Sequence, residues 1–221
     1  SCWDCQQCKA NNQPSGNVMA DYPKSFKPGM GYAIDAVGPL PLTPRKHMYI
    51  LTAVDLASRW VIALPVLNIK QEKLWDFVLE HIILKFGAPE ILLNDNGSPF
   101  DSHYFMDQCE KFNISLHPIP KYTPQCNPVE RQHRTVNTGL RIFAEDHRQW
   151  DNHLPYLIFS INNSICESTG FSPAKLTYGR NLRMPYELFK ETDNGYLLEF
   201  QPEEYYQHLD DELLEMFESA V

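Results

Sequence analysis

The sequence has no apolar run long enough to cross a membrane. A membrane-spanning helix needs about 18 or more consecutive apolar residues, and the longest candidate, residues 82–86, is already broken by Lys85. A membrane protein is therefore excluded. An initiating Met and an apolar leader are also missing, because the chain opens Ser-Cys-Trp-Asp-Cys. We expect a processed chain or an excised fragment, in which no targeting information survives.

Cysteine is scarce and irregularly placed. Of six cysteines, three fall within the first eight residues, and Cys109, Cys126 and Cys166 are scattered without a pattern. This distribution excludes a disulfide scaffold. Hydrophobic residues, in contrast, make up 43% of the 221 residues and aromatic residues 12%. A chain of this length and composition can bury a large core, which argues against intrinsic disorder.

Positive charge is absent from one end of the chain. Residues 191–221 contain ten Asp and Glu and no Lys or Arg, whereas residues 1–190 contain all 19 Lys and Arg against 18 Asp and Glu. The net charge of −9 therefore belongs to the tail. A nucleic-acid ligand is not excluded for the main body, where local patches decide binding.

The pattern of apolar residues predicts an α/β fold. Three apolar, β-branched runs at residues 32–37, 48–55 and 60–66 indicate an antiparallel meander of short strands. Residues 70–86 then change to a helical period, with Leu74, Phe77, Val78, Ile82 and Phe86 on one stripe and Gly87 as the stop. A buried strand at 91–93, a helix from Ser102 to about 112 and a strand at 114–119 follow. This order predicts a mixed sheet flanked by helices.

The remainder of the chain is predicted to be mainly helical. Residues 121–127 contain Pro124 and no periodicity, so they should form a mobile loop. Asn127 and Pro128 are typical of the start of a helix, which we expect to run to about residue 146. Further helices are predicted at 150–163 and, more briefly, from Ser172.

Three carboxylates stand in unusual places along these elements. Asp35 interrupts the first apolar strand, Asp95 follows the buried strand at 91–93, and Glu130 lies in the first turn of a helix. Ligands of open α/β sheets collect at the carboxyl ends of strands, and hard divalent cations require oxygen ligands. Each acid also has a structural alternative. Asp35 can be an ordinary satisfied polar residue, Asp95 a turn residue, and Glu130 the N3 member of a capping box with Asn127.

The segments around these acids resemble the three catalytic motifs of integrases. They read Asp35-Ala-Val-Gly-Pro-Leu-Pro, Asn94-Asp-Asn-Gly-Ser-Pro-Phe, and Pro124-Gln-Cys-Asn-Pro-Val-Glu-Arg-Gln-His-Arg. Thirty-four residues separate the second and third acids, close to the spacing in this family. Val54-Asp-Leu-Ala-Ser-Arg-Trp and Ser168-Thr-Gly-Phe-Ser-Pro-Ala-Lys-Leu-Thr-Tyr-Gly-Arg resemble integrases of gypsy-type LTR retrotransposons in particular. The resemblance covers about residues 1–189.

The resemblance implies an RNase H-like core with catalytic and metal-binding residues Asp35, Asp95 and Glu130. Such a triad holds two Mg²⁺ or Mn²⁺ ions, which stabilise the attacking and leaving oxygens of an in-line displacement. The implied enzyme is a polynucleotidyl transferase that trims element DNA ends and joins them to target DNA. The implied partners are double-stranded DNA and further copies of the chain, and the implied location is the nucleus, with virus-like particles in the cytoplasm as a second location. Asp55, the rival acid, leads into a turn, and we interpret it as structural.

The resemblance also divides the chain. Residues 1–9 are similar to the end of a zinc module, 10–30 to a linker, 31–189 to the catalytic core, and 190–221 form an acidic tail. Cys2 and Cys5 resemble the last two zinc ligands, but no His precedes them, so Zn²⁺ binds only if the missing His pair is present in a longer protein. The alternative is a stub with oxidisable cysteines. Asn127-Pro128 stands where many members have Gly, which should stiffen the loop into the catalytic helix.

The predicted helix after Asn127 has a basic face suited to DNA. At 100° per residue, Glu130, Arg134, Asn137 and Arg141 fall near one another, apart from the apolar face of Val129, Val136, Leu140 and Phe143. Arg pairs with phosphate through a bidentate fork, although a solvated charged face remains the alternative. The predicted DNA-binding residues are Lys121, Tyr122, Gln125, Arg131, Arg134, Asn137 and Arg141.

The acidic tail has a helical pattern of its own. Tyr206, Leu209, Leu213, Met216 and Ala220 recur at spacings of three and four, which predicts a short amphipathic helix that docks on the core, pairs with another copy or mimics DNA charge. For the whole chain, an active integrase core competes with a host-adopted relic that binds DNA or protein without catalysis. A metal-dependent RNase H-type nuclease is a third hypothesis, which leaves the motifs after residue 160 unexplained.

Overall fold

The computed structural model describes residues 27–94, 100–118, 136, 138 and 147–183. Their centre is one five-stranded sheet in the order β3-β2-β1-β4-β5. β1, β2 and β3 pair antiparallel, whereas β4 pairs parallel with both β1 and β5. The strands are β1 (Gly31–Val37), β2 (Tyr49–Asp55), β3 (Val61–Val66), β4 (Ile91–Asn94) and β5 (Ser115–Pro118). The predicted meander and mixed sheet are confirmed.

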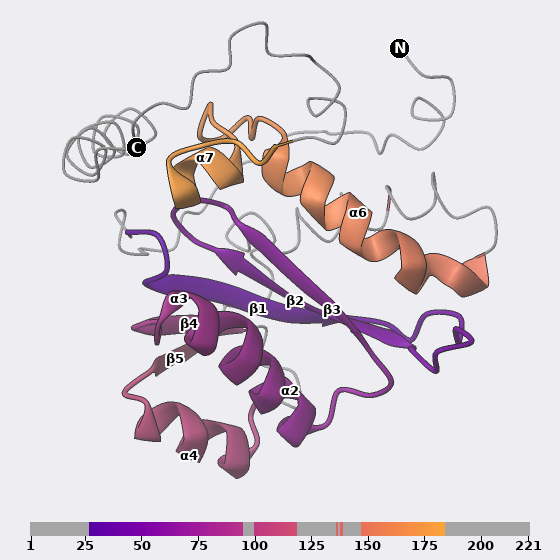
Figure 1. The fold of residues 1–221 in the computed structure, drawn as a ribbon. Coiled ribbons are helices and arrows are strands. Elements are labelled where there is room, and N and C mark those ends of the chain that lie inside the picture. The colour runs from indigo at the N-terminus through magenta and orange to yellow at the C-terminus, as the bar shows by residue number, and fades with distance from the viewer. Residues whose placement is uncertain (1–26, 95–99, 119–135, 137, 139–146, 184–221) are drawn as a thin grey trace, which may run out of the picture.

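Helices cover both faces of this sheet (Figure 1). On one face lie α2 (Gln71–Val78), its continuation through η1 (Leu79–Ile83) and α3 (Leu84–Phe86), and α4 (His103–Lys111). On the other face lie α6 (Trp150–Asn163), preceded by η3 (His147–Gln149), and α7 (Pro173–Tyr178). The sheet is thus the middle layer of three.

Alternation along β1 decides which residues meet each helical layer. Tyr32 and Ile34 belong to the core cluster that includes Leu74 and Phe105 of α2 and α4. Ala33, between them, belongs to a cluster against which Ile158 and Ile161 of α6 pack. Successive side chains of a strand point to opposite faces, so the odd-numbered residues of β1 face the α6 layer.

The helix after β3 departs from the predicted regular pattern. Leu74, Phe77, Val78 and Ile82 are buried as expected, but Leu79–Ile83 form a π-helical turn. A π turn carries one residue more than an α turn, so the residues after it are rotated relative to the predicted stripe. Phe86 is therefore only half-buried and packs against Trp60, with 6.4 Å between ring centroids. Gly87 ends the helix at a φ of 94°.

The other predicted helices fall where the sequence placed them, among the residues described. The Ser102 side chain caps α4 by accepting a hydrogen bond from the backbone nitrogen of Phe105, and Ser172 caps α7 in the same way through Lys175. Residues 136 and 138, within the helix expected at 128–146, are helical. The remainder of that helix, the cysteine stub, the linker and the acidic tail lie outside the described residues, so the proposed division into domains stays a prediction.

Candidate active site

Asp35 is the fifth residue of β1 and is half-buried. It pairs with Thr52 of β2, whose hydroxyl donates a hydrogen bond of 3.2 Å to the Asp35 carbonyl oxygen. The Asp35 carboxylate accepts a hydrogen bond of 2.7 Å from the backbone nitrogen of Ala36. Asp35 has the same parity along the strand as Ala33, so its side chain projects toward the face that carries α6.

The neighbours of the other two predicted acids also lie on this face. Leu93, two residues before Asp95, packs in the same cluster as Ala33, whereas Asn94, which is buried and ends β4 beside Pro118, has the opposite parity along the strand. Val136 is buried with Ile50, Trp150 and Leu154, as predicted for the apolar face of its helix. Asp95 and Glu130 themselves lie outside the described residues.

The remaining predicted site residues lie outside the described ranges as well. They are the DNA-contact residues Lys121, Tyr122, Gln125, Arg131, Arg134, Asn137 and Arg141, and the cysteines Cys2 and Cys5. Among the residues that the structure describes, no group of three His, Cys, Asp or Glu side chains could hold a metal ion. Of the predicted triad, only Asp35 can be placed.

Asp55, the rival acid, has a structural environment. It is 1% exposed, and its carboxylate accepts hydrogen bonds from the backbone nitrogens of Gly29, Ala57 and Ser58 and from the Ser58 hydroxyl. Asp55 pairs with Tyr32 near the start of β1, so it lies about 10 Å along the sheet from Asp35 and on the opposite face. These contacts fix the turn after β2, as interpreted from the sequence.

A small hollow of about 190 Å³ lies at this other end of the sheet, lined by Tyr32, Asp55, Trp60 and Phe86 among others. Burial raises the pKa of the Tyr32 hydroxyl, and the nearby Asp55 carboxylate raises it further. The hydroxyl therefore stays protonated over the ordinary pH range. Because Tyr32 and Asp55 of its lining belong to the opposite face of the sheet from Asp35, the hollow is not part of the candidate site.

A feature that the sequence did not reveal is the hairpin formed by residues 38–48, which joins β1 to β2. Backbone hydrogen bonds from Leu40 to Met48 and from Thr43 to His47 continue the pairing of the two strands. The hairpin leaves the sheet at the carboxyl end of β1 and lies beside the start of α6 (Figure 1). The sequence indicated only a turn there, because the partners of this loop are more than 100 residues away.

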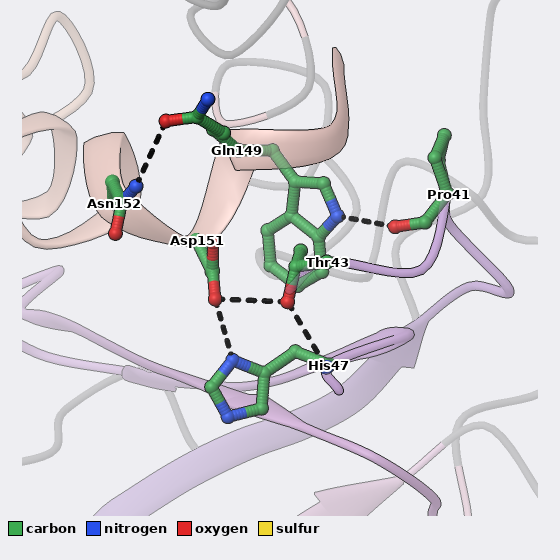
Figure 2. Close-up of polar contacts among 7 residues, drawn as sticks. Pro41, Thr43, His47, Gln149, Asp151 and Asn152 are labelled. Atoms are coloured by element: carbon green, nitrogen blue, oxygen red, sulfur yellow. Dashed lines mark hydrogen bonds and ion pairs between the residues drawn. The ribbon is translucent and has the colours of Figure 1, made fainter. Parts of the chain in front are cut away.

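The start of α6 holds this hairpin through side chains (Figure 2). The Thr43 hydroxyl donates to Asp151 Oδ2 at 3.0 Å, and His47 Nδ1 lies 2.7 Å from the same oxygen. The Trp150 indole donates to the Pro41 carbonyl at 2.8 Å. Asp151 is 2% exposed and lies in the first turn of α6, where a carboxylate is favoured by the helix dipole. We call Thr43, His47 and Asp151 the hairpin clamp.

Within the described ranges, no helix is both long and apolar enough to span a lipid bilayer.

The topology and the strand-borne carboxylate define a class of protein, the RNase H-like α/β domains. Comparison with known sequences agrees: residues 27–124 match the integrase core domain family. The chain is 27% identical over 187 residues to the gypsy retrotransposon integrase-like protein 1 of Bos taurus, and 25% identical over 154 residues to the retrovirus-related Pol polyprotein from transposon 412 of Drosophila melanogaster. These matches cover 82% and 69% of the chain, but only 36% and 12% of the two relatives.

Solved structures give the same result for the fold. A chain of the simian T-cell lymphotropic virus intasome superposes with a TM-score of 0.62 at 21% identity, covering 83% of this chain and 66% of the other. The HTLV-2 integrase catalytic core domain, solved in complex with magnesium in a trimeric form, superposes with a TM-score of 0.55 at 18% identity, covering 69% and 98%. The resemblance to integrase catalytic cores and the RNase H-like fold class are confirmed.

Proposed function

We propose that this chain is the catalytic core of a retroelement integrase, which processes the 3′ ends of element DNA and transfers them to target DNA. Asp35, Asp95 and Glu130 would hold two Mg²⁺ or Mn²⁺ ions. The partners would be duplex DNA at both steps and further copies of the chain, and the site of action would be the nucleus. The curated relatives are about three or more times longer than the matched region, so further segments would contribute to the complete enzyme.

The register between β1 and β4 is the observation that carries this proposal. Ala33 pairs with Leu93, Asp35 is two residues beyond Ala33, and Asp95 is two residues beyond Leu93. Continued by two residues, the register would bring Asp35 and Asp95 together on the α6 face. Val136, six residues after Glu130, is buried on the same face. Because six helical residues rise only about 9 Å, Glu130 would be within reach of both acids.

The residues present suit a divalent metal. Asp35 offers a hard carboxylate oxygen from a rigid central strand, paired on both sides by β2 and β4, and magnesium prefers carboxylate ligands that leave room for phosphate oxygens. When bound, two such ions stabilise the charge that develops on the attacking and leaving oxygens. The chain itself would position the metal-binding carboxylate, because Asp35 is fixed by its strand and by the hydrogen bond from the Ala36 nitrogen.

The test is strand transfer by the full chain on labelled duplex ends with Mn²⁺. We expect joined products from the parent protein and none from Asp35→Asn, while Asp107→Asn, an exposed position on α4, keeps full activity. Asp107→Asn removes the same charge away from the candidate site and is the matched control. Products that persist in Asp35→Asn would contradict the proposed role.

A second readout separates catalysis from binding alone. Three converging carboxylates repel one another without metal, so millimolar Mg²⁺ or Mn²⁺ should raise the melting temperature of the parent, and Asp35→Asn or Asp95→Asn should abolish that rise. DNA binding without either strand transfer or a metal-dependent rise would instead favour a host-adopted binding module.

A further inference from the structure

The end of the sheet that carries Asp35 is rich in cations. No Asp or Glu occurs between Asp35 and Asp55, whereas Arg45, Lys46 and His47 occupy the hairpin. Arg45 and Lys46 are exposed at its tip, and neither forms an ion pair with any residue that the structure describes. Arg148, just before α6, is exposed as well, and the only acid within residues 147–166, Asp151, is buried. Among the described residues of this end, Arg45 and Lys46 therefore present positive charge to solvent.

Hydrogen bonds also restrain the tip. Lys46 donates its backbone nitrogen to the Thr43 carbonyl at 2.8 Å and has a φ of 65°, which closes a tight turn over residues 43–46. The His47 backbone nitrogen donates to the Thr43 hydroxyl at 3.1 Å, and the hairpin clamp ties both residues to α6. Figure 2 shows the second ring nitrogen of His47 directed away from Asp151. A clamped loop loses little conformational entropy when its side chains bind.

We propose that Arg45 and Lys46, presented by the hairpin 38–48, hold the phosphate backbone of the DNA duplex that reacts at Asp35. This inference rests on the proposed function and names an additional contact for the same substrate. Arg and Lys at a fixed site bind phosphate oxygens irrespective of base sequence. His47 is a positioning residue that keeps the two cations in place through Asp151.

The distance between Asp35 and the hairpin tip indicates that the bound DNA is a duplex. Asp35 pairs with Thr52, and the hairpin continues eight residues beyond Asp35 to Thr43. Eight fully extended residues span on the order of 25 Å, which is the upper limit for this distance. Because base pairs stack about 3.4 Å apart, the tip would meet phosphates within roughly seven base pairs of the reactive one. Only a stiff duplex holds its backbone at a defined distance over that length.

The salt dependence of DNA binding tests this contact. The full chain and Arg45→Gln/Lys46→Gln are titrated against a blunt-ended duplex, without divalent metal, over a series of salt concentrations. Each lost phosphate contact reduces the magnitude of the slope of log affinity against log salt by about 0.9. The slope of the double variant should therefore be smaller in magnitude by about 2 than that of the full chain. Its affinity for the duplex at low salt should be roughly tenfold lower. Lys85→Gln/Lys111→Gln, which removes the same charge from exposed positions on α3 and α4, should leave the slope unchanged.

Equal losses in the two double variants, or none in the hairpin variant, would overturn the proposal. The second result is also the one expected if the hairpin contacts an acidic protein instead of DNA. Repeating the titration with a covalently closed plasmid identifies the source of the duplex. A loss confined to the blunt-ended duplex assigns the contact to element ends, and a loss on both assigns it to target DNA.

Variants of His47 test the clamp. His47→Ala should lower the affinity for the duplex roughly three- to tenfold, because binding must then pay the conformational entropy of ordering the hairpin tip. The slope of log affinity against log salt should not change, because Arg45 and Lys46 both remain. His47→Asn retains a donor near the position of Nδ1 and should restore binding. A clamp that only stabilises the fold would lower the melting temperature without changing the affinity of folded protein. All of these measurements are made without metal, so an absence of strand transfer would contradict the proposed function alone.

Discussion

At the scale of the residue, two Asp side chains of the central strands have different surroundings. Asp35 is half-buried on a central strand, facing the α6 layer. Asp55 is buried under three backbone donors and one hydroxyl. The hydrogen bonds of Asp55 direct its carboxylate to the turn that it stabilises.

Asp55 should give a pH-dependent contribution to stability. Burial raises its pKa above the ordinary value, although hydrogen bonds from Ser58, Gly29 and Ala57 partly oppose this. Because the pKa of Asp55 is higher in the folded than in the unfolded state, protonation of Asp55 stabilises the fold. This stabilisation is fully present at pH values below the pKa of the unfolded state and is lost as the pH rises through the pKa of the folded state. Asp55→Asn should destabilise by about 1–3 kcal/mol, because its amide group meets backbone donors. The difference in unfolding free energy from the parent should narrow as pH rises from about 4, measured by denaturant titration. A difference that does not vary with pH would contradict this.

Glu130 can be either a metal ligand or a helix cap, and one substitution separates the roles. Glu130→Gln keeps a side chain able to complete the capping box with Asn127 but removes the charge that a metal requires. We expect stability within about 1 kcal/mol of the parent, with strand transfer abolished. Thermal unfolding and the strand-transfer assay together distinguish the two roles of Glu130. Strand-transfer activity retained in Glu130→Gln would refute the role as a metal ligand, and a large loss of stability would favour the role as a helix cap.

At the scale of the element, α6 is attached to the sheet through polar contacts at two places. Its first turn holds the hairpin through Trp150 and Asp151. Farther along, the Asn162 side chain accepts from the Val61 nitrogen and donates to the Val61 carbonyl, both at 2.8 Å. Val61 starts β3, an edge strand of the sheet. Asn162 thus satisfies backbone groups that an edge strand would otherwise leave unpaired.

Removing this contact should be costly. Asn162 is 2% exposed, so Asn162→Ala leaves a backbone donor and an acceptor buried without partners, at a cost of about 2–4 kcal/mol in unfolding free energy. Asn152→Ala, on the same helix with only a 3.4 Å contact to Gln149, should change stability by less than about 0.5 kcal/mol. Denaturant titration of both variants measures the two losses of unfolding free energy. Equal losses would show that the hydrogen bonds between Asn162 and Val61 do not stabilise the fold.

At the scale of the whole molecule, charge is divided between the folded body and the tail. The cationic hairpin lies at the end of the sheet that carries Asp35, whereas the ten acids without Lys or Arg lie at residues 191–221. We expect this acidic segment to compete with DNA phosphates for the cations, most strongly where salt screening is weak.

Deletion of residues 191–221 changes the net charge from −9 to +1. We expect tighter non-specific duplex binding at low ionic strength, and a lower melting temperature if the predicted amphipathic helix docks on the core. Binding titrations at two salt concentrations and thermal unfolding measure the two effects separately. If neither changes, the tail is an inert extension and the predicted helix is wrong.

The sequence alone determined the elements and the class of the protein. Alternating apolar residues, the Ser102 and Ser172 caps and the stop at Gly87 predicted strands and helices that the structure contains, because these signals act over a few residues. The motifs around Asp35, Asp95 and Glu130 indicated the integrase resemblance for the same reason, since each motif is a contiguous segment of the sequence.

Only the tertiary structure decided which of these residues meet. The pairing of Ala33 with Leu93 joins segments 60 residues apart in the sequence, and the hairpin clamp joins Thr43 to Asp151 over 108 residues. The burial of Asp55 likewise depends on a distant segment, because its carboxylate accepts a hydrogen bond from the Gly29 nitrogen, 26 residues away. Local propensity contains no information about such contacts, because their energy exists only once the sheet and its two helical layers have assembled.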